Sequence, residues 1–285
     1  MAGKNKLTFL GKNKIKCPVC LEHFQKEELL TGGGRMIAGP LTDELRREYE
    51  PSKKYGEVFP LVYSVMVCPH CFYAAYPQDF PNVPESSLDN IKNDHILRAN
   101  TMKKLIPDLN FENNRRLQEG VASYHLASMC YELLPKDFSP TFKMAMSVLR
   151  AAWLSTNLHK KYPGENWDYM REIYYHKANF LYSLVLEKEV SGAESLGGVT
   201  NFGPCSDKNF GYDGVLYLSG LLEYKFGGQG DRQRRLASLQ SARQSISRIV
   251  GLGKSSKSKP SDILEMARDL HKSIGSLLKE LEDGE

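Results

Sequence analysis

The stretches KIKCPVC (residues 14–20) and MVCPHC (residues 66–71) each contain a Cys-Pro-x-Cys pair, and residues 21–67 separate them. Cysteine pairs of this kind occur in disulfide frameworks, redox dithiols, iron sites and structural zinc sites. The choice among these four determines the fold of the N-terminal part of the chain, because it decides whether the two stretches meet in space.

A structural zinc site is the interpretation that these residues favour. Zinc takes four ligands in a tetrahedron and binds thiolates at about 2.3 Å. A Cys-x-x-Cys turn directs two sulfurs at one point, and the proline after the first cysteine fixes φ and removes a competing N–H group. A module this small also gains from a metal the stability that its own core cannot supply. The sequence therefore predicts a structural Zn²⁺ bound by Cys17, Cys20, Cys68 and Cys71.

The alternatives fit the pattern less well. An iron site of the rubredoxin type uses the same sulfur geometry, so the sequence leaves iron open as the less favoured metal. A redox dithiol is typically one Cys-x-x-Cys that opens a helix in a βαβ unit, and two matched pairs do not fit that arrangement. Four thiolates also close the ligand shell and leave no position for water, which indicates a structural metal.

Two features depart from the usual zinc ribbon. The separation of the pairs exceeds the roughly 15–20 residues typical of that module, although the entropy cost of closing a loop grows only logarithmically with its length. Leu21 and Phe72 directly follow the second cysteine of each pair, where zinc knuckles often have a glycine with left-handed backbone. His23 and His70 lie near enough to replace a cysteine, but with four thiols present we expect both to face solvent.

The two remaining cysteines are expected to play no part in this site. Cys130 stands on an apolar helical face and is predicted to pack in the core. Cys205 lies in the loop-like stretch NFGPCSD, where the sequence shows no base that would activate it as a nucleophile.

Residues 1–80 are expected to form a small, zinc-ribbon-like α+β module. Its composition predicts a loop at 31–40, a short helix at 41–52 and a strand at 57–68 that leads into the second cysteine pair. Residues 81–110 are expected to be a connector that contains a helix at about 88–105.

From residue 111 to residue 285 the chain has helical periodicity, with apolar residues recurring at steps of three and four. Ser139 and Asp231 are expected at helix N-caps, and Pro140 at a first helical position. Consecutive helices of this length suggest stacked antiparallel pairs, as in an α-solenoid. The predicted fold is thus mainly α, with helices at 112–134, 139–161, 164–190, 208–227, 231–250 and 260–282.

The stretches IKCPVCLEHF (15–24) and YSVMVCPHCFYAAYPQDF (63–80) resemble an uncharacterised bacterial family, domain of unknown function 2225. The resemblance implies that the four cysteines are the ligands, that Tyr73–Phe80 is a flanking signature, and that a tetratricopeptide-like helical region follows. YLSGLLEYKFGG (217–228) is similar to the first helix of such a repeat, with Gly220 at its small position. The family has no established activity, so the resemblance implies architecture more than function.

No enzyme fingerprint stands out in the sequence. GLGKSSKS (251–258) is similar to a phosphate loop, but Arg248 occupies the position of the required first glycine and a predicted helix precedes it. No His-Glu-x-x-His motif is present, and no nucleophile or acid–base pair emerges, so we predict neither catalytic nor cofactor-binding residues. We expect a non-enzymatic, cytoplasmic bacterial protein without a membrane span, because no apolar run approaches the ~20 residues that a span needs.

The predicted partner is a protein or peptide that binds the helical region, with Tyr174, Tyr175, Tyr217 and Tyr224 either lining a groove or packing between helices. The net charge of +4 does not by itself require a nucleic-acid partner. Residues 231–259 are nevertheless rich in arginine and lysine, and an acidic stretch follows them. These opposite charges predict either pairing between the last two helices or, as the alternative function, nucleic-acid binding together with the zinc module.

Overall fold

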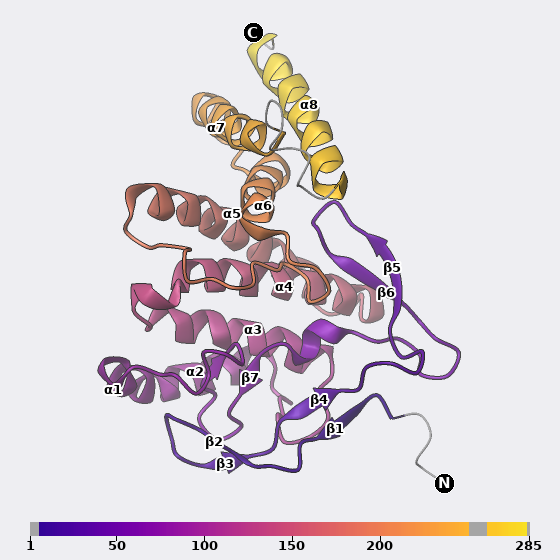
Figure 1. The fold of residues 1–285 in the computed structure, drawn as a ribbon, viewed down its shortest axis with the longest axis vertical. Helices are drawn as coiled ribbons and strands as arrows, with labels where there is room; N and C mark the ends of the chain where they lie inside the picture. Colours follow the sequence, from indigo (N-terminus) through magenta and orange to yellow (C-terminus); the bar gives the residue numbers. More distant parts are fainter. Residues whose placement is uncertain (1–5, 251–260, 284–285) are drawn as a thin grey trace.

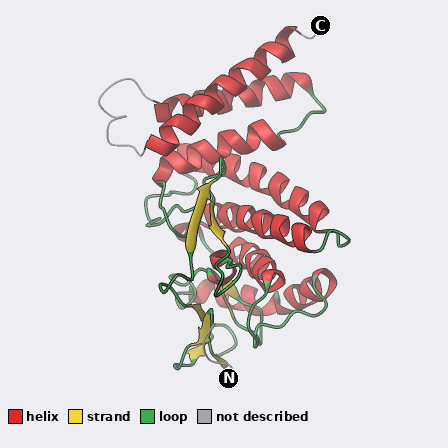
Figure 2. Ribbon diagram, turned by 90° about the vertical axis from the view of Figure 1, so that its right-hand side faces the viewer, coloured by secondary structure: helices red, strands yellow, loops and turns green. Residues whose placement is uncertain are grey.

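The computed structural model describes residues 6–250 and 261–283. In these ranges the chain forms eight α-helices and four two-stranded antiparallel sheets (Figure 1). The small sheets lie mostly at the N-terminal end, and the helices stack above them in chain order up to the C-terminus. Figure 2 shows the strands along one side of the helical stack. The predicted class, mainly α with a small N-terminal module, is confirmed.

Each sheet is a short antiparallel pair. The pairs are β1 (Thr8–Leu10) with β4 (Glu27–Leu29), β2 (Ile15–Lys16) with β3 (His23–Phe24), β5 (Ile37–Leu41) with β6 (Arg47–Glu50), and β7 (Met66–Val67) with β8 (Ala74–Ala75). Two-stranded pairs of this length are not stable alone. They therefore depend on packing against the rest of the protein.

The prediction of a helix at 41–52 is wrong, because these residues belong to the β-hairpin formed by β5 and β6. Leu45 closes the turn between β5 and β6 with φ of 57°, and its side chain is fully buried. Glu44, beside it, accepts hydrogen bonds from the Tyr175 hydroxyl (2.8 Å) and from the Trp153 indole. These contacts with two distant helices override the local helical pattern. β5 also extends into the predicted loop at 31–40.

The prediction of a strand at 57–68 is also largely wrong. Only Met66–Val67 is extended, and Pro60–Tyr63 forms a 3₁₀ turn, η1. Proline is suited to the first position of a helical turn because its φ is already fixed and it has no N–H to satisfy. Leu61 and Val62 of η1 are buried against helix α3 (Leu117–Glu132), so burial rather than strand pairing accounts for the apolar run.

The helices follow the predicted pattern closely. The expected helix at 88–105 is divided at Asp94 into α1 and α2, whereas the six later predictions each correspond to one helix. Their bounds are α1 (Glu85–Asn93), α2 (His95–Leu105), α3 (Leu117–Glu132), α4 (Pro140–Lys161), α5 (Trp167–Ser191), α6 (Gly211–Phe226), α7 (Arg232–Val250) and α8 (Ser261–Asp283). None of them is long and apolar enough to cross a membrane.

The two expected N-caps differ in what their side chains do. Asp231 Oδ1 accepts a hydrogen bond from the Arg234 amide at 3.0 Å, as a capping residue should. Ser139 precedes α4 and Pro140 takes the first helical position, but the Ser139 hydroxyl donates to the carbonyl oxygen of Ser195 (2.8 Å). Ser139 therefore links α4 to the loop after α5 instead of capping its own helix.

Each helix from α3 to α8 packs against the next helix in the chain. This order is that of a helical stack, but a tetratricopeptide repeat is not confirmed, because residues 192–210 form a long connection between α5 and α6. Gly220 does have the predicted small-residue role: a Cβ built there would lie 2.8 Å from the Ile246 side chain of α7. The glycine permits the close approach of α6 and α7.

The N-terminal module and the helices share one continuous hydrophobic core. The Tyr124 hydroxyl of α3 donates to the carbonyl oxygen of Leu61 (2.7 Å), and the Arg115 guanidinium donates to that of Val65 (2.8 Å). Glu27, on β4, accepts a 2.7 Å hydrogen bond from the Arg115 amide. The division into 1–80, 81–110 and 111–285 stays a prediction about which parts fold as units.

Candidate metal centre

Two equivalent hairpins carry the cysteine pairs. In the first, β2 leads into the turn that contains Cys17 and Cys20, and β3 returns. The Cys17 amide donates to the carbonyl oxygen of Glu22 (2.9 Å), and the Leu21 amide donates to that of Cys17 (3.0 Å). Both sulfurs therefore lie at the tip of one tight hairpin.

The second hairpin, between β7 and β8, repeats this pattern. The Cys68 amide donates to the carbonyl oxygen of Tyr73, and the Phe72 amide donates to that of Cys68, both at 2.9 Å. Residue for residue, these two bonds match those of the first hairpin. The sequence repeat Cys-Pro-x-Cys is thus a repeat of backbone conformation.

The residue after each pair has the left-handed backbone that a glycine often adopts at this position of zinc knuckles. The φ angle is 67° at Leu21 and 55° at Phe72. A side chain in this region costs about 1–2 kcal/mol relative to glycine. The turns keep the knuckle conformation despite this cost, so the absence of glycine does not indicate a different kind of turn.

The two hairpin tips bring the four sulfurs together. Cys17 Sγ lies 3.7 Å from Cys71 Sγ, and Cys20 Sγ lies 3.6 Å from Cys68 Sγ. All four Sγ atoms lie within 4.8 Å of one another. Disulfide sulfurs are about 2.05 Å apart, whereas four sulfurs at about 2.3 Å from a tetrahedral zinc are about 3.8 Å apart. The cluster therefore has the dimensions of a tetrathiolate site and could hold a metal ion.

The thiols of Cys17, Cys68 and Cys71 perturb one another's pKa strongly. Hydrogen bonds with the Cys68 and Cys71 thiols lower the pKa of Cys17 to about 2, and the amides of Cys20 and Val19 contribute to the same shift. Interaction with Cys17 raises the pKa of Cys68 to about 12 and that of Cys71 far above its usual range. Ionisation of Cys17 thus opposes ionisation of Cys68 and Cys71. A central cation would offset that opposition, because it attracts every thiolate.

Two buried residues from the helices support the second hairpin. Arg98 of α2 is fully buried and donates to the carbonyl oxygen of Cys71 at 3.1 Å, while it pairs with Asp94 at 3.0 Å. Cys130 of α3 is in the core, as predicted, and its sulfur accepts a hydrogen bond from the Ala74 amide at 3.4 Å. In sequence, Asp94 and Arg98 resemble an ordinary surface ion pair, so no signal identified this contact.

The other residues considered from sequence lie away from the four sulfurs. His23 and His70 are exposed, as expected when four thiols complete the set. Cys205 belongs to a loop, but it is buried, and its thiol lies 3.9 Å from the carbonyl oxygen of Arg47. The phosphate-loop-like stretch at 251–258 falls outside the residues that the structure describes.

Three of the four tyrosines proposed for a groove are buried between elements. Tyr174 contacts His125 Nδ1 through its hydroxyl (2.9 Å), the Tyr175 hydroxyl donates to Glu44, and the Tyr217 hydroxyl donates to the carbonyl oxygen of Asp43 (2.8 Å). Tyr224 is partly buried. Tyr174, Tyr175 and Tyr217 therefore pack between elements and do not line a groove.

The fold and the cluster define a class: a helical protein with an N-terminal four-cysteine module. The chain belongs to the uncharacterized protein family conserved in bacteria described as DUF2225, whose model matches residues 10–274. It is 44% identical over 276 residues to an uncharacterized protein of Borreliella burgdorferi (strain B31), covering 97% of this chain and 99% of the relative. No solved structure matches the chain.

Proposed function

We propose that the protein is a non-enzymatic binding protein in which one structural zinc ion, held by Cys17, Cys20, Cys68 and Cys71, fixes the N-terminal module on a helical platform. The observation that carries the metal proposal is the cluster of four sulfurs at tetrahedral separations. Zinc fits better than iron on the general preference of closed thiolate cages in structural sites. Four thiolates leave no ligand position for a substrate, which favours a structural role.

Metal analysis of the purified protein tests the zinc proposal. We expect about one zinc per chain, reduced strongly in a Cys68→Ser variant. A Cys205→Ser variant, which removes a buried thiol outside the cluster, is the matched control and should keep its zinc. Replacement by Co²⁺ should give the visible absorption of a tetrahedral tetrathiolate complex. Stoichiometric iron in freshly prepared protein, or zinc that survives the loss of Cys68, would contradict the proposal.

An apolar stripe on α5 supports a protein partner. Tyr169, Ile173 and Phe180 are exposed by 66%, 40% and 64% of their surface and recur on one face of the helix. The opposite face of α5 is buried against α4. Large apolar side chains that gather on one exposed face commonly mark interaction surfaces. The stripe therefore supports binding of an apolar surface of another protein.

Site-specific crosslinking tests this partner proposal. A photoreactive phenylalanine analogue at position 180 should crosslink one defined protein in cells, and serine at Tyr169 should reduce the yield. The same analogue at the exposed position of Lys103 on α2 is the control and should not capture that protein. If the same protein is captured equally from positions 180 and 103, or if Tyr169→Ser leaves the crosslinking yield unchanged, α5 is not the docking face.

Nucleic-acid binding through residues 231–259 remains the alternative prediction. Arg235 of this stretch is buried and pairs with Glu223 at 2.7 Å, and Arg232 donates to the carbonyl oxygen of Leu281 at 2.7 Å. These two arginines therefore serve contacts within the C-terminal helices. Lys254, Lys257 and Lys259 lie outside the described residues. Binding to RNA or DNA that weakens steeply with salt, and weakens further in an Arg234→Gln variant, would favour this alternative.

A further inference from the structure

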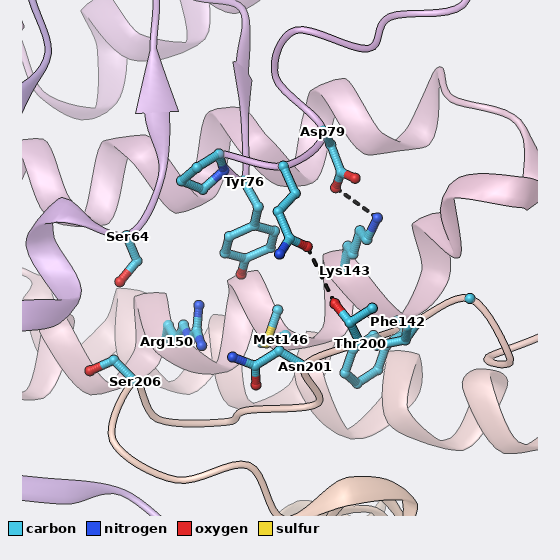
Figure 3. A pocket seen from close by; sticks show the side chains of 14 residues that line it. Ser64, Tyr76, Asp79, Phe142, Lys143, Met146, Arg150, Thr200, Asn201 and Ser206 are labelled. Carbon is cyan, nitrogen blue, oxygen red and sulfur yellow. Dashed lines mark hydrogen bonds and ion pairs between the residues drawn. The ribbon is translucent and has the colours of Figure 1, made fainter.

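A second candidate site lies in a cavity of about 370 Å³, and the residues that line it include Ser64 and Tyr76, which flank the second cysteine pair in sequence. Its walls come from α4, from the segment that follows β8, and from the loop at 198–206 (Figure 3). The volume is within the range of small-molecule pockets, about 300–1,000 Å³. The cavity is thus large enough for a small organic ligand.

Arg150 is the unusual residue of this cavity. It is only 6% exposed, and its Nε donates a 2.7 Å hydrogen bond to the carbonyl oxygen of Pro204. Its guanidinium carbon lies 5.3 Å from the centre of the Tyr76 ring and 5.9 Å from that of Tyr124. Figure 3 shows the guanidinium below Tyr76, between Ser64 and Asn201. These contacts hold the group in place and aim it into the cavity.

A comparison with the other buried arginines shows what Arg150 lacks. Arg98 pairs with Asp94 at 3.0 Å, and Arg235 pairs with Glu223 at 2.7 Å. Among the described residues, no carboxylate forms an ion pair with Arg150. Burial of a charge without a counter-ion is destabilising, because hydrogen bonds and ring contacts only partly repay the loss of hydration. An anion that enters the cavity would supply the missing partner.

The remaining charges in the cavity cancel. Lys143 Nζ pairs with Asp79 Oδ2 at 2.7 Å, and the same oxygen accepts a 2.6 Å hydrogen bond from the Tyr131 hydroxyl. Lys143 and Asp79 thus form a neutral pair, and Arg150 leaves the cavity wall with one uncompensated positive charge. This balance matches a monoanion. A phosphate monoester, which carries nearly two negative charges at neutral pH, matches it less well.

The other lining groups indicate what the ligand is like beyond its charge. Ser64, Asn201 and Ser206 offer polar groups near the guanidinium, whereas Phe142 and Met146 provide apolar surface. We propose that this cavity binds a small organic carboxylate, with the carboxylate on the Arg150 guanidinium and an apolar body against Phe142 and Met146. An arginine fork binds a planar carboxylate through two parallel hydrogen bonds.

Methionine methyl NMR provides a direct test, because Met146 lines the cavity. In protein labelled with ¹³C at the methionine methyl groups, benzoate should shift the Met146 signal in a saturable way. The uncharged analogue benzamide should shift it far less at the same concentration. The Met266 signal, from α8, should not move with either probe. The Met146 signal is assigned with a Met146→Leu variant.

Substitution of Arg150 separates charge recognition from simple filling of the cavity. Arg150→Gln should weaken benzoate binding about tenfold or more, since it removes a charge-assisted hydrogen bond. Arg150→Lys should retain part of the affinity, and Arg234→Gln, an exposed arginine on α7, should bind as wild type does. If Arg150→Gln does not fold, the benzoate and benzamide titrations of the wild type decide the matter alone.

The outcomes that overturn the proposal are specific. Equal shifts from benzoate and benzamide would mean that the cavity selects apolar bulk and not charge. Saturable shifts from methyl phosphate in the absence of any from benzoate, acetate or succinate would assign the cavity to a phosphate group instead of a carboxylate. No shift of Met146 with any of these probes up to millimolar concentration would remove the site.

Discussion

Arg98 Nη2 lies 3.1 Å from the carbonyl oxygen of Cys71 and donates a hydrogen bond to it from a fully buried side chain. This bond connects α2 to the backbone of the second cysteine hairpin. It also places a positive charge beside a cluster that, with bound zinc, would carry two negative charges. The arginine is therefore a support of the sulfur cluster that is not itself a ligand.

Replacing Arg98 should loosen this support. Arg98→Gln leaves the buried carbonyl of Cys71 without its partner, so we expect the free energy of unfolding to fall by about 1–3 kcal/mol and zinc to dissociate faster into a chelator. Urea denaturation and chelator kinetics measure the two effects. Lys103→Gln, at an exposed position of the same helix, is the control. Zinc release at the wild-type rate would show that Arg98 stabilises only the helices.

The left-handed residues of the two hairpins should respond in opposite ways to glycine. Leu21 is 59% exposed, so Leu21→Gly mainly relieves backbone strain and should stabilise the zinc-loaded protein by up to about 1 kcal/mol. Phe72 packs edge-on against Phe111, with 6.2 Å between ring centres, so Phe72→Gly should be destabilising despite the same relief. Urea midpoints at fixed zinc concentration measure both. Destabilisation by Leu21→Gly would mean that its φ carries little strain.

The contact of α6 with α7 at Gly220 predicts a compensating pair. Gly220→Ala would place a methyl group 2.8 Å from Ile246, and the resulting overpacking should cost about 1–3 kcal/mol. Ile246→Ala in the same chain makes room, so the double variant should lose less stability than the sum of the two single variants. A double-mutant cycle by thermal or urea denaturation measures the coupling. If the effects of Gly220→Ala and Ile246→Ala simply add, the methyl group at position 220 does not clash with Ile246.

The lowered pKa of His125 predicts that the free energy of unfolding falls in acid. Burial lowers its pKa to about 4, whereas the unfolded chain has the ordinary value of 6.5. Below pH 6.5 the unfolded state therefore binds the proton first, and stability falls until the pH reaches about 4. The full contribution is about 3 kcal/mol.

The measurement is the free energy of unfolding from pH 7 to pH 4, compared between wild type and His125→Gln. The difference between the two proteins should narrow or reverse as the pH falls, because the variant has no imidazole to protonate. The exposed His176→Gln is expected to follow the wild type. Parallel pH profiles of wild type and His125→Gln would contradict a lowered pKa in the folded state.

The helices and the cysteine pairs were predictable because their signals are local. Apolar spacing gave the six later helices to within a few residues, and the pattern of Cys17 and Cys20, repeated at Cys68 and Cys71, indicated a common centre. Each signal lies within one short stretch of sequence. Local patterns of this kind predict an element without knowledge of its tertiary contacts.

The hairpin at residues 37–50 and the Arg150 cavity were not predictable in this way. Glu44 and Leu45 lie in a stretch with helical character, and only their contacts with distant helices favour a turn. Arg150 is one of several basic residues of α4, and its lack of a carboxylate partner becomes visible only when α4, the segment after β8 and the loop at 198–206 come together. Both features depend on tertiary contacts that sequence spacing does not encode.

The hairpin of β5 and β6 belongs to the same loop of chain that the sulfur cluster would close, and it is anchored independently at the far end. Asp43 pairs with Lys225 of α6 at 2.8 Å, and Arg46 donates to Asn157 of α4 at 2.7 Å. Loss of the ion would therefore break the link between the two cysteine pairs, but the β5–β6 hairpin between them would stay bound to α4 and α6. The two cysteine pairs would stay near each other, so recapture of an ion would require only a local search and not a new encounter of distant parts of the chain.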